Sequence, residues 1–236
     1  MNKSKHFTSA IILCAGSGDR MQGTDKQLTA LLGTPIAIRS TMAFEKCDNI
    51  DEIILVTRQE QISVFEELVK SYKLSKVTKV VCGGSTRQQS ALCGVQAVWQ
   101  GCKFIAIHDG ARCLITPKQI SCVTEQAYKH NAATAATRCS DTVKLATKAD
   151  FTQTSGHPDR SKLWLAQTPQ AFKLTLYQGA VHTGKDVAVT DDCAIIESAG
   201  FYVKLVDCGR SNMKITTKED LVIAQAILST REEQHD

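Results

Sequence analysis

Short apolar runs alternate along the chain with segments that carry apolar residues at helical spacing. The apolar runs show no polar alternation, which predicts strands buried on both faces of a sheet. They span residues 9–14, 51–57, 77–82 and 103–109. The segments with helical spacing span residues 36–47, 59–73 and 87–100. This order predicts an α/β fold with a mainly parallel sheet, in which the loops after the strands gather at one edge.

The stretch TPKQISCVTEQAYKH (116–130) carries the start signals of a further helix. Thr116 is suited to cap it and Pro117 to occupy its first position, while Gln119 completes a capping box. The later pattern predicts helices near 173–183 and 190–199, a strand at 201–207 and a last helix from Thr217.

The pattern changes between about residues 138 and 165, where β-like ends flank a polar middle that contains Gly and Pro. Because little helical periodicity remains, this segment predicts a strand pair that projects from the body and can meet a partner subunit. No internal repeat, low-complexity segment or linker occurs in the 236 residues. We therefore expect one domain, 1–236, with an insertion at about 138–165.

Charge and composition argue against two classes of partner. The net charge of +4 comes from 28 basic and 24 acidic residues, and the bases are scattered, so no nucleic-acid partner is expected. No apolar run approaches the roughly 18–20 residues of a membrane span. A local basic pocket for a small anion fits this mild excess of positive charge.

The ten cysteines predict buried thiols. They include no C-x-x-C pair, and the six histidines do not cluster with them, so we expect no metal site. Without a signal peptide, a disulfide framework is not expected either. Most of the cysteines have apolar neighbours and are expected to act as small core residues in a reducing cytoplasm.

The stretch CAGSGDRMQGTDKQ (14–27) follows the first predicted strand and indicates phosphate binding. Gly16 and Gly18 let backbone N–H groups approach an anion, and Arg20 and Lys26 can neutralise it. Two separate cations suit a reaction in which negative charge moves between phosphates. A simple strand–helix turn with exposed charges is the alternative.

Two common nucleotide-binding loops fit this stretch less well. A dinucleotide-binding loop needs a third glycine where Met21 stands, and that glycine permits close packing of helix on strand. A Walker A loop needs lysine directly after its last glycine, whereas two residues separate Gly23 from Lys26.

Further polar clusters follow later strands, at the same expected edge. In GGSTRQQS (83–90) the glycine pair allows backbone contact with a planar base, and Ser90 can form a hydrogen bond. In HDGAR (108–112) Asp109 can bind ribose hydroxyls or magnesium and Arg112 a phosphate, or the two form a plain salt bridge.

Four further residues or stretches complete the set of candidates. His108 is expected to be structural, and Lys214 in GRSNMKIT (209–216) is either a site residue or surface charge. More polar groups lie in SDTVK (140–144) and DRSKLWLAQTPQAF (159–172).

Taken together and in order, these motifs resemble the 2-C-methyl-D-erythritol 4-phosphate cytidylyltransferase family of the non-mevalonate isoprenoid pathway. The resemblance runs from about residue 9 to 222 through AGSGDRM with KQ, GG…R…S, HDGAR, SDTVK, LWLAQTPQAF and GRSNMKIT. It implies a single Rossmann-like α/β domain with a protruding β-arm that interlocks a homodimer. It also implies transfer of CMP from CTP to the sugar-alcohol phosphate, with release of pyrophosphate.

The resemblance implies roles for individual residues. Those matched to neutralisation of the triphosphate and the transition state, the expected catalytic residues, are Arg20, Lys26 and Lys214. Those matched to nucleotide contacts are Ala15, Gly16, Gly18, Gly84, Ser85, Ser90 and Asp109. Those matched to the acceptor, some through the arm of a neighbouring subunit, are Asp109, Arg112, Thr142, Arg160 and Thr190. Mg²⁺ is expected to bind mainly through the CTP phosphates, without a metal site of the protein's own.

The sequence departs from the family pattern at three places. Leu13-Cys14-Ala15 replaces the usual Pro-Ala-Ala, and Cys113 replaces a proline after HDGAR. Asp25 stands where the family has proline before the lysine, which places a carboxylate next to Lys26 and would partly neutralise it.

Three other functions compete with this interpretation. Ribitol-5-phosphate cytidylyltransferase shares the fold, but its motifs are more like Ala-Gly-Gly and HDSVRP. An NAD-dependent oxidoreductase is disfavoured by Met21 at the third glycine position. A non-catalytic nucleotide-binding module would keep the glycines but has no need of Arg20, Lys26 and Lys214 together.

Overall fold

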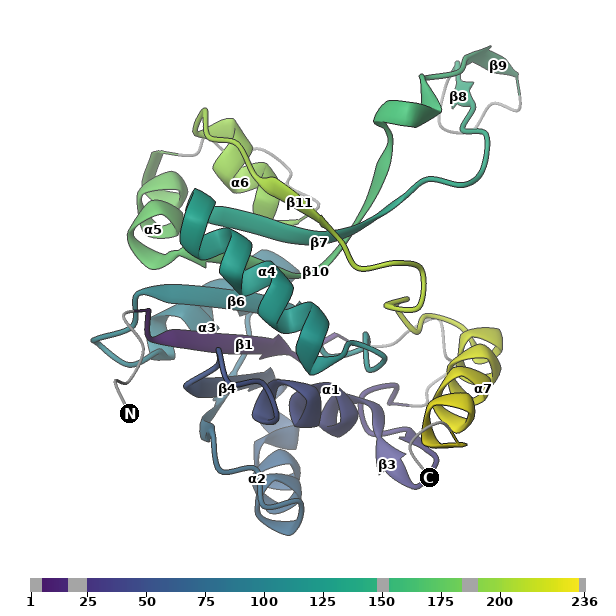
Figure 1. The fold of residues 1–236 in the computed structure, drawn as a ribbon. Coiled ribbons are helices and arrows are strands. Elements are labelled where there is room, and N and C mark those ends of the chain that lie inside the picture. Colours follow the sequence, from purple (N-terminus) through teal and green to yellow (C-terminus); the bar gives the residue numbers. More distant parts are fainter. Residues whose placement is uncertain (1–5, 17–24, 148–152, 184–190, 234–236) are drawn as a thin grey trace.

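A seven-stranded sheet forms the centre of the molecule (Figure 1). The computed structural model describes residues 6–16, 25–147, 153–183 and 191–233. The strands of this sheet, in spatial order, are β11 (Lys204–Asp207), β7 (Ala132–Arg138), β10 (Trp164–Lys173), β6 (Phe104–Asp109), β1 (Thr8–Leu13), β4 (Glu52–Thr57) and β5 (Val77–Cys82). In this sheet β10 alone runs antiparallel to its neighbours.

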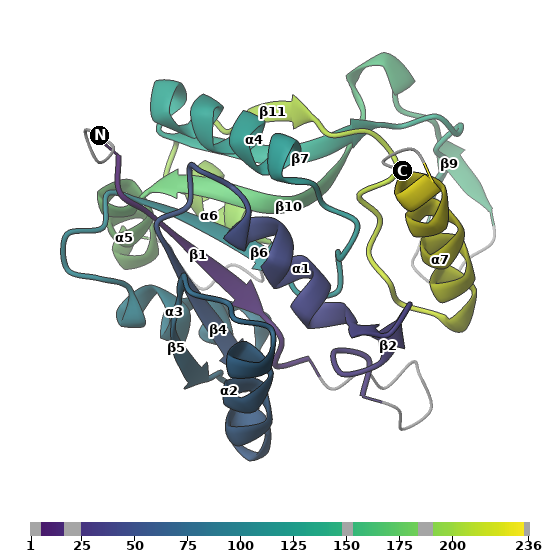
Figure 2. The same cartoon turned by 60° about the horizontal axis from the view of Figure 1, so that its bottom comes forward.

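Helices cover both faces of this sheet (Figures 1 and 2). One face carries α1 (Ile36–Glu45), α2 (Ile62–Ser71) and α4 (Pro117–His130). The other carries α3 (Arg87–Ala97), α5 (Leu174–Thr183) and α6 (Asp192–Ser198). The period of two along β1 explains the arrangement, since Ala10 and Ile12 pack on the first face and Ile11 and Leu13 on the second. The predicted mainly parallel α/β fold is confirmed.

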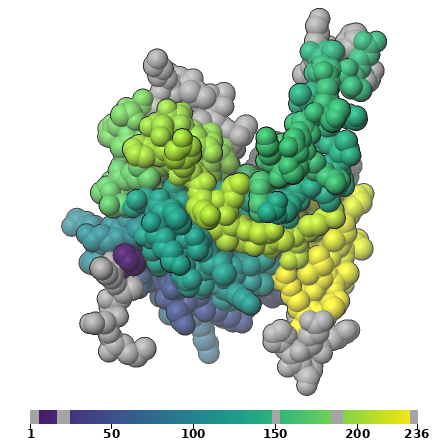
Figure 3. Space-filling view, turned by 45° about the horizontal axis from the view of Figure 1, so that its top comes forward, coloured from purple at the N-terminus to yellow at the C-terminus, as the bar shows by residue number. Residues whose placement is uncertain are grey.

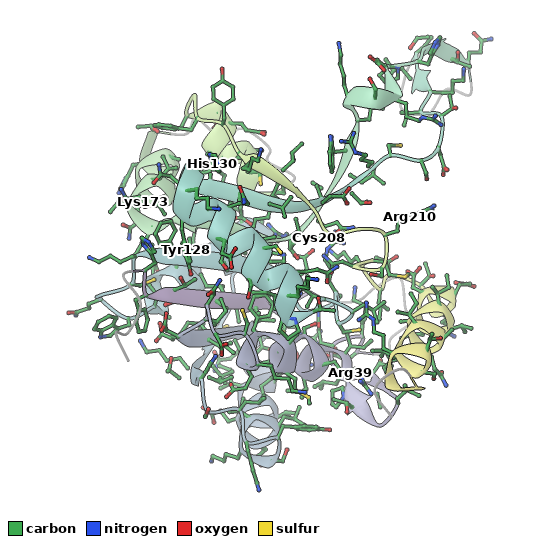
Figure 4. The ribbon with its side chains drawn as sticks, in the orientation of Figure 1. Arg39, Tyr128, His130, Lys173, Cys208 and Arg210 are labelled. Carbon is green, nitrogen blue, oxygen red and sulfur yellow. The ribbon has the colours of Figure 1, made fainter. Side chains whose placement is uncertain are left out.

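A third apolar cluster lies at the carboxyl edge of the sheet, under α7 (Lys218–Glu233). It includes Leu31 of the short hairpin β2 (Ala30–Leu31) and β3 (Thr34–Pro35), and Ile215, which is fully buried. Arg39 of α1 donates hydrogen bonds to the carbonyls of Leu31 (2.6 Å) and Leu32 (3.0 Å) and so ties this hairpin to the body (Figure 4). This cluster fixes the segment in which Lys214 lies.

The start of α4 follows the prediction from its sequence. The Thr116 hydroxyl accepts a hydrogen bond from the backbone N–H of Gln119, and the Gln119 side chain accepts one from the backbone N–H of Thr116. Pro117 occupies the first turn. On the last turn, Tyr128 points toward the amino-terminal segment (Figure 4), where its hydroxyl lies 2.7 Å from the Thr8 hydroxyl.

The insertion forms an arm that stands clear of the body (Figures 1 and 3). The chain leaves the sheet after β7 and returns at Trp164, whose ring lies under the guanidinium of Arg138 at 4.5 Å from the ring centre. Between these points lie the antiparallel pair β8 (Leu145–Ala146) and β9 (Thr154–Gly156) and a short helix η3 (Arg160–Lys162). The projecting strand pair was predicted at about 138–165.

Two central strands, β7 and β10, were not predicted. The sequence of β7, AATAATR, is rich in alanine, which has low β-propensity, yet six of its seven residues are buried between two layers of helices. In β10 the register shifts between Ala166 and Gln170, around Pro169, and the bulge hides the strand pattern. Burial in the sheet therefore overrides local propensity at β7, and the bulge interrupts the pattern at β10.

Two predicted strands differ from their expected form. The 77–82 run was expected to be buried on both faces, but β5 is an edge strand whose residues are exposed or half-buried. The 201–207 strand starts only at Lys204, since Tyr202 is 94% exposed and precedes the sheet.

None of the helices in the described ranges has the length and apolar composition that crossing a bilayer requires.

The packing of α3 on the sheet predicts a strong effect of a single methyl group. A Cβ at Gly94 would lie 2.4 Å from Cγ2 of Ile11 and 3.0 Å from Cγ2 of Val56. Gly94→Ala is expected to lower the free energy of unfolding by about 1–3 kcal/mol through overpacking, measured by urea denaturation. Gly179→Ala in α5, where nothing lies within 4 Å of the added Cβ, is the control and is expected to gain up to about 1 kcal/mol. Equal effects at the two glycines would contradict the packing argument.

Candidate active site

A pocket of about 330 Å³ opens beyond the carboxyl ends of β1 and β6. The strand order reverses at β1, because β4 follows it on one side and β6 lies on the other. Ligands of open α/β sheets bind in the crevice at such a point. The pocket is lined by Leu13, Ala15, Gly16, Lys26, Gln27, Gly84, Ser85, Thr86, Arg87, Ser90, Asp109, Ala111 and Lys214.

Asp109 at the end of β6 is the one carboxylate among these lining residues, and cations surround it. Its Oδ1 lies 3.1 Å from Nε of Arg87, and its Oδ2 lies 2.8 Å from Nζ of Lys214. Nε of Arg112 is 4.0 Å from Oδ2. Burial by itself would raise the pKa of Asp109, but Arg87, Lys214 and Arg112 more than offset this and hold the pKa well below its usual range. Asp109 is therefore ionised throughout the working pH range.

Arg87 connects this carboxylate to a second, buried one. Its Nη1 lies 2.7 Å from Oδ2 of Asp192, the first residue of α6. The hydroxyl of Tyr177 donates to the other oxygen of Asp192 at 2.8 Å, and the backbone N–H of Asp192 donates to Gln170 at 3.0 Å. These contacts fix the Arg87 guanidinium, which then holds Asp109 in place.

His108 lies inside the protein and not in the pocket. Its side chain is fully buried, and burial lowers its pKa to about 3. The Thr168 hydroxyl accepts from the N–H of Asp109 and lies 3.0 Å from Nδ1 of His108, and Nε2 of His108 lies 3.3 Å from the carbonyl of Arg112. We infer a neutral ring that accepts at Nδ1 and donates at Nε2, which agrees with the structural role expected for this residue.

The glycine pair after β5 forms a close backbone turn against the pocket. A Cβ at Gly84 would lie 2.3 Å from Cβ of Gln89, and one at Gly83 would lie 2.7 Å from Oγ of Ser90. Ser90 Oγ accepts from the N–H of Gly84 at 3.2 Å and donates to the Thr86 carbonyl at 2.9 Å. Ser90 thus holds the turn as well as lining the pocket.

The structure brings most of the predicted nucleotide and catalytic residues to this one pocket. These are Ala15, Gly16, Lys26, Gly84, Ser85, Ser90, Asp109 and Lys214. Lys214 is therefore not mere surface charge, since it pairs with Asp109. Gly18, Arg20 and Thr190 lie outside the described residues.

The remaining predicted acceptor residues do not line the pocket of this chain. Arg112 is largely buried and donates to the carbonyl of Asn212 at 2.9 Å. Thr142 and Arg160 are exposed on the arm, and Arg160 donates to the carbonyl of Ser140 at 3.0 Å.

Sequence reasoning did not single out three polar residues of the pocket. Arg87 lay inside the quoted GG…R…S motif, but nothing local indicates that it reaches Asp109, 22 positions away. Thr86 forms a capping box with Gln89 at the start of α3, a T-x-x-Q signal that is visible in the sequence. Gln27 is 4% exposed, and no sequence pattern predicts this burial.

Comparison with known proteins assigns this arrangement to a family. Residues 8–230 match the sequence profile of 2-C-methyl-D-erythritol 4-phosphate cytidylyltransferase. The chain belongs to this family. The enzyme of that name from Geobacillus kaustophilus is 38% identical over 225 residues, which cover 94% of this chain and 97% of the relative. The one from Alkaliphilus oremlandii is 39% identical over 230 residues, 96% of this chain and 97% of the relative.

A solved structure of the family has the same fold. The 4-diphosphocytidyl-2C-methyl-D-erythritol synthase of Anaerococcus prevotii superposes with a TM-score of 0.83 at 30% identity, over 95% of this chain and 96% of that one. The fold and family that the motifs predicted are therefore confirmed, and the protein is a nucleotidyltransferase.

The environment of His108 predicts a neutral imidazole at physiological pH. Its pKa is lowered from 6.5 to about 3, so the unfolded chain binds the additional proton and stability falls as the pH drops below about 6.5. Long-range ¹H–¹⁵N NMR spectra are expected to show the Nε2-protonated neutral form from about pH 8 to about pH 5. His108→Asn, which cannot titrate, is expected to lose less unfolding free energy over the same range. A charged ring near pH 6 would contradict this assignment.

The pocket loop also predicts which thiols react. Cys14 is fully buried, and burial, followed by the charges of Asp25 and Asp109, raises the pKa of its thiol far above the usual value. Cys82 and Cys122 are exposed. Iodoacetamide followed by peptide mass spectrometry is expected to modify Cys82 and Cys122 first and Cys14 only after unfolding. Rapid modification of Cys14 in the native protein would show that the loop opens.

Proposed function

We propose that this protein transfers CMP from CTP to 2-C-methyl-D-erythritol 4-phosphate and releases pyrophosphate, at the pocket beyond β1 and β6. The observation that carries the proposal is a single pocket in which Arg87 and Lys214 pair with Asp109 and which Lys26 also lines. Family membership supports the choice of substrates.

The reaction is an in-line attack by an oxygen of the acceptor phosphate on the α-phosphorus of CTP. One P–O bond forms, the bond to pyrophosphate breaks, and the electron pair leaves with pyrophosphate. A phosphate monoester is already a nucleophile at neutral pH, so no general base is needed. The neutral, fully buried His108 fits a reaction of this kind, in which the protein positions reactants and stabilises charge.

The lysines neutralise charge that moves during the reaction. Lys26 and Lys214 line the pocket from opposite ends of the chain, and Arg20, six positions before Lys26 in the sequence, would add a third cation. The close backbone turn at Gly84 and Ser85 would contact the base through main-chain groups. The Asp109 carboxylate would accept hydrogen bonds from ribose or acceptor hydroxyls.

We propose that Mg²⁺ enters this pocket mainly on the phosphates of CTP. Mg²⁺ binds proteins through one or two carboxylates together with substrate phosphates, and Asp109 is an ionised carboxylate that faces the pocket. In the described ranges, no group of three or more His, Cys, Asp or Glu could hold a metal alone. When bound, the ion would neutralise phosphate charge.

We propose further that two copies assemble through the arm and complete each other's acceptor site. Thr142 and Arg160 are exposed on an arm that stands clear of its own body (Figure 3), so they are available to a neighbouring pocket. The protein would work in the cytoplasm, where its ten free thiols stay reduced.

Pyrophosphate release from CTP and Mg²⁺ tests the activity, with methylerythritol phosphate and ribitol 5-phosphate as parallel acceptors. Preference for the first is expected, and preference for the second would change the substrate assignment. Lys26→Ala and Lys214→Ala are each expected to lower kcat by about 10²-fold, as for other preorganised donors. Lys103→Ala, an exposed lysine at the other edge of the sheet, is the control and should leave kcat unchanged.

Mixing two defective variants tests the assembly through the arm. Lys26→Ala impairs a chain's own pocket, and Arg160→Ala is expected to raise the acceptor KM of the partner's pocket. In a mixed dimer one of the two pockets has both residues, so refolding the variants together should restore about a quarter of wild-type activity at low acceptor. No gain on mixing would mean that Arg160 serves its own pocket or none.

A further inference from the structure

We infer that Asp25, Arg58 and Gln61 position Lys26, by tying the loop after β1 to the end of β4. The inference rests on the proposed role of Lys26 at the phosphates. The three residues form a polar cluster beside the pocket, and none of them lines it. They are positioning residues and not catalytic residues.

Asp25 organises its own segment of the loop. Its Oδ1 accepts from the backbone N–H of Gln27 at 2.9 Å. Its carbonyl accepts from the N–H and the hydroxyl of Thr29, both at 2.9 Å, and from the N–H of Leu28 at 3.2 Å. These bonds close a turn directly around Lys26, which lies between the two residues that make the first contact.

The other oxygen of Asp25 anchors this turn to the sheet. Oδ2 of Asp25 accepts hydrogen bonds from Nη2 of Arg58 and Nε2 of Gln61. Arg58 directly follows β4, all six residues of which are buried, and Gln61 ends the short helix η2 (Gln59–Gln61). The Thr57 hydroxyl donates to Oε1 of Gln61 at 3.2 Å, which fixes the orientation of this amide.

These contacts also answer the concern that Asp25 would neutralise Lys26. Both oxygens of Asp25 accept from other groups, and the positive charge of Arg58 balances the carboxylate. The two side chains are only 22% and 31% exposed, so solvent screens this pair less than it screens a surface pair. Lys26 itself lines the pocket.

Loss of the anchor should lower turnover through Lys26. Asp25→Ala and Arg58→Ala are each expected to lower kcat by roughly 10- to 100-fold, the effect of misplacing a reacting group by about an ångström. Arg58→Lys, which keeps the charge, should recover part of the loss. Glu60→Ala removes an exposed partner of Arg58 at 3.2 Å without touching Asp25, and should leave kcat unchanged.

A double-mutant cycle separates positioning from a general loss of structure. If Asp25 acts through Lys26, adding Asp25→Ala to Lys26→Ala should lower kcat no further. A full additional loss in the double variant would overturn the inference, as would unchanged kcat in Asp25→Ala when Lys26→Ala is impaired. Full activity of Lys26→Ala alone would instead refute the proposed role of Lys26.

Urea denaturation shows whether a variant loses activity only because it unfolds. Asp25→Asn keeps an acceptor for the N–H of Gln27 but puts an NH₂ donor against Arg58 and Gln61, so it breaks the anchor and keeps the turn. Its unfolding midpoint is measured to establish that the variant is folded. The inference predicts that this folded variant still loses kcat. Wild-type kcat in a folded Asp25→Asn would show that the ion pair with Arg58 does not position Lys26.

Discussion

The buried carboxylate of Asp109 between Arg87 and Lys214 is the interaction on which the pocket depends. A lone carboxylate at this depth would be protonated or expelled, because burial disfavours its charge. Without this carboxylate, the positive charges of Arg87 and Lys214 would repel each other. Strand β6 contributes Asp109, helix α3 contributes Arg87, and the loop before α7 contributes Lys214. The charge cluster therefore joins three parts of the chain at one point.

The layered sheet explains why these members meet. β1 and β6 are central and parallel, so their carboxyl ends reach one edge together, and α3 places Arg87 over that edge. The cluster under α7 then fixes Ile215, whose N–H donates to the carbonyl of Ala111 at 2.9 Å, and this backbone bond brings Lys214 to Asp109. The apolar packing under α7 thus determines where the ion pair between Lys214 and Asp109 forms.

The sequence predicted the parts of the structure that local physics determines. Buried parallel strands such as β1, β4 and β6 are continuous apolar runs. The capping box and the proline at the start of α4 can be recognised directly in the sequence. The motifs also located the pocket residues at Gly84, Asp109 and Lys214. Their order along the chain could be matched to a family pattern without knowledge of any contact.

What the sequence did not predict depends on distant partners. The alanine-rich β7 is a strand because helices bury it, and β10 is interrupted by its bulge. Arg87 meets Asp192 across 105 positions, and Arg58 meets Asp25 across 33, which no local pattern encodes. The sequence suggested that Asp25 would partly neutralise Lys26, because the contact between Asp25 and Arg58 cannot be predicted from the sequence.

The pairing of β7 with β10 has a consequence for how the arm can vary. The two strands are antiparallel neighbours, so the chain leaves the sheet and re-enters it at the same place, where Arg138 pairs with Trp164. Residues gained or lost between these points lengthen or shorten the excursion and leave every strand register in the sheet intact. The surface of the arm can therefore diverge among descendants of this chain while the pocket stays as it is.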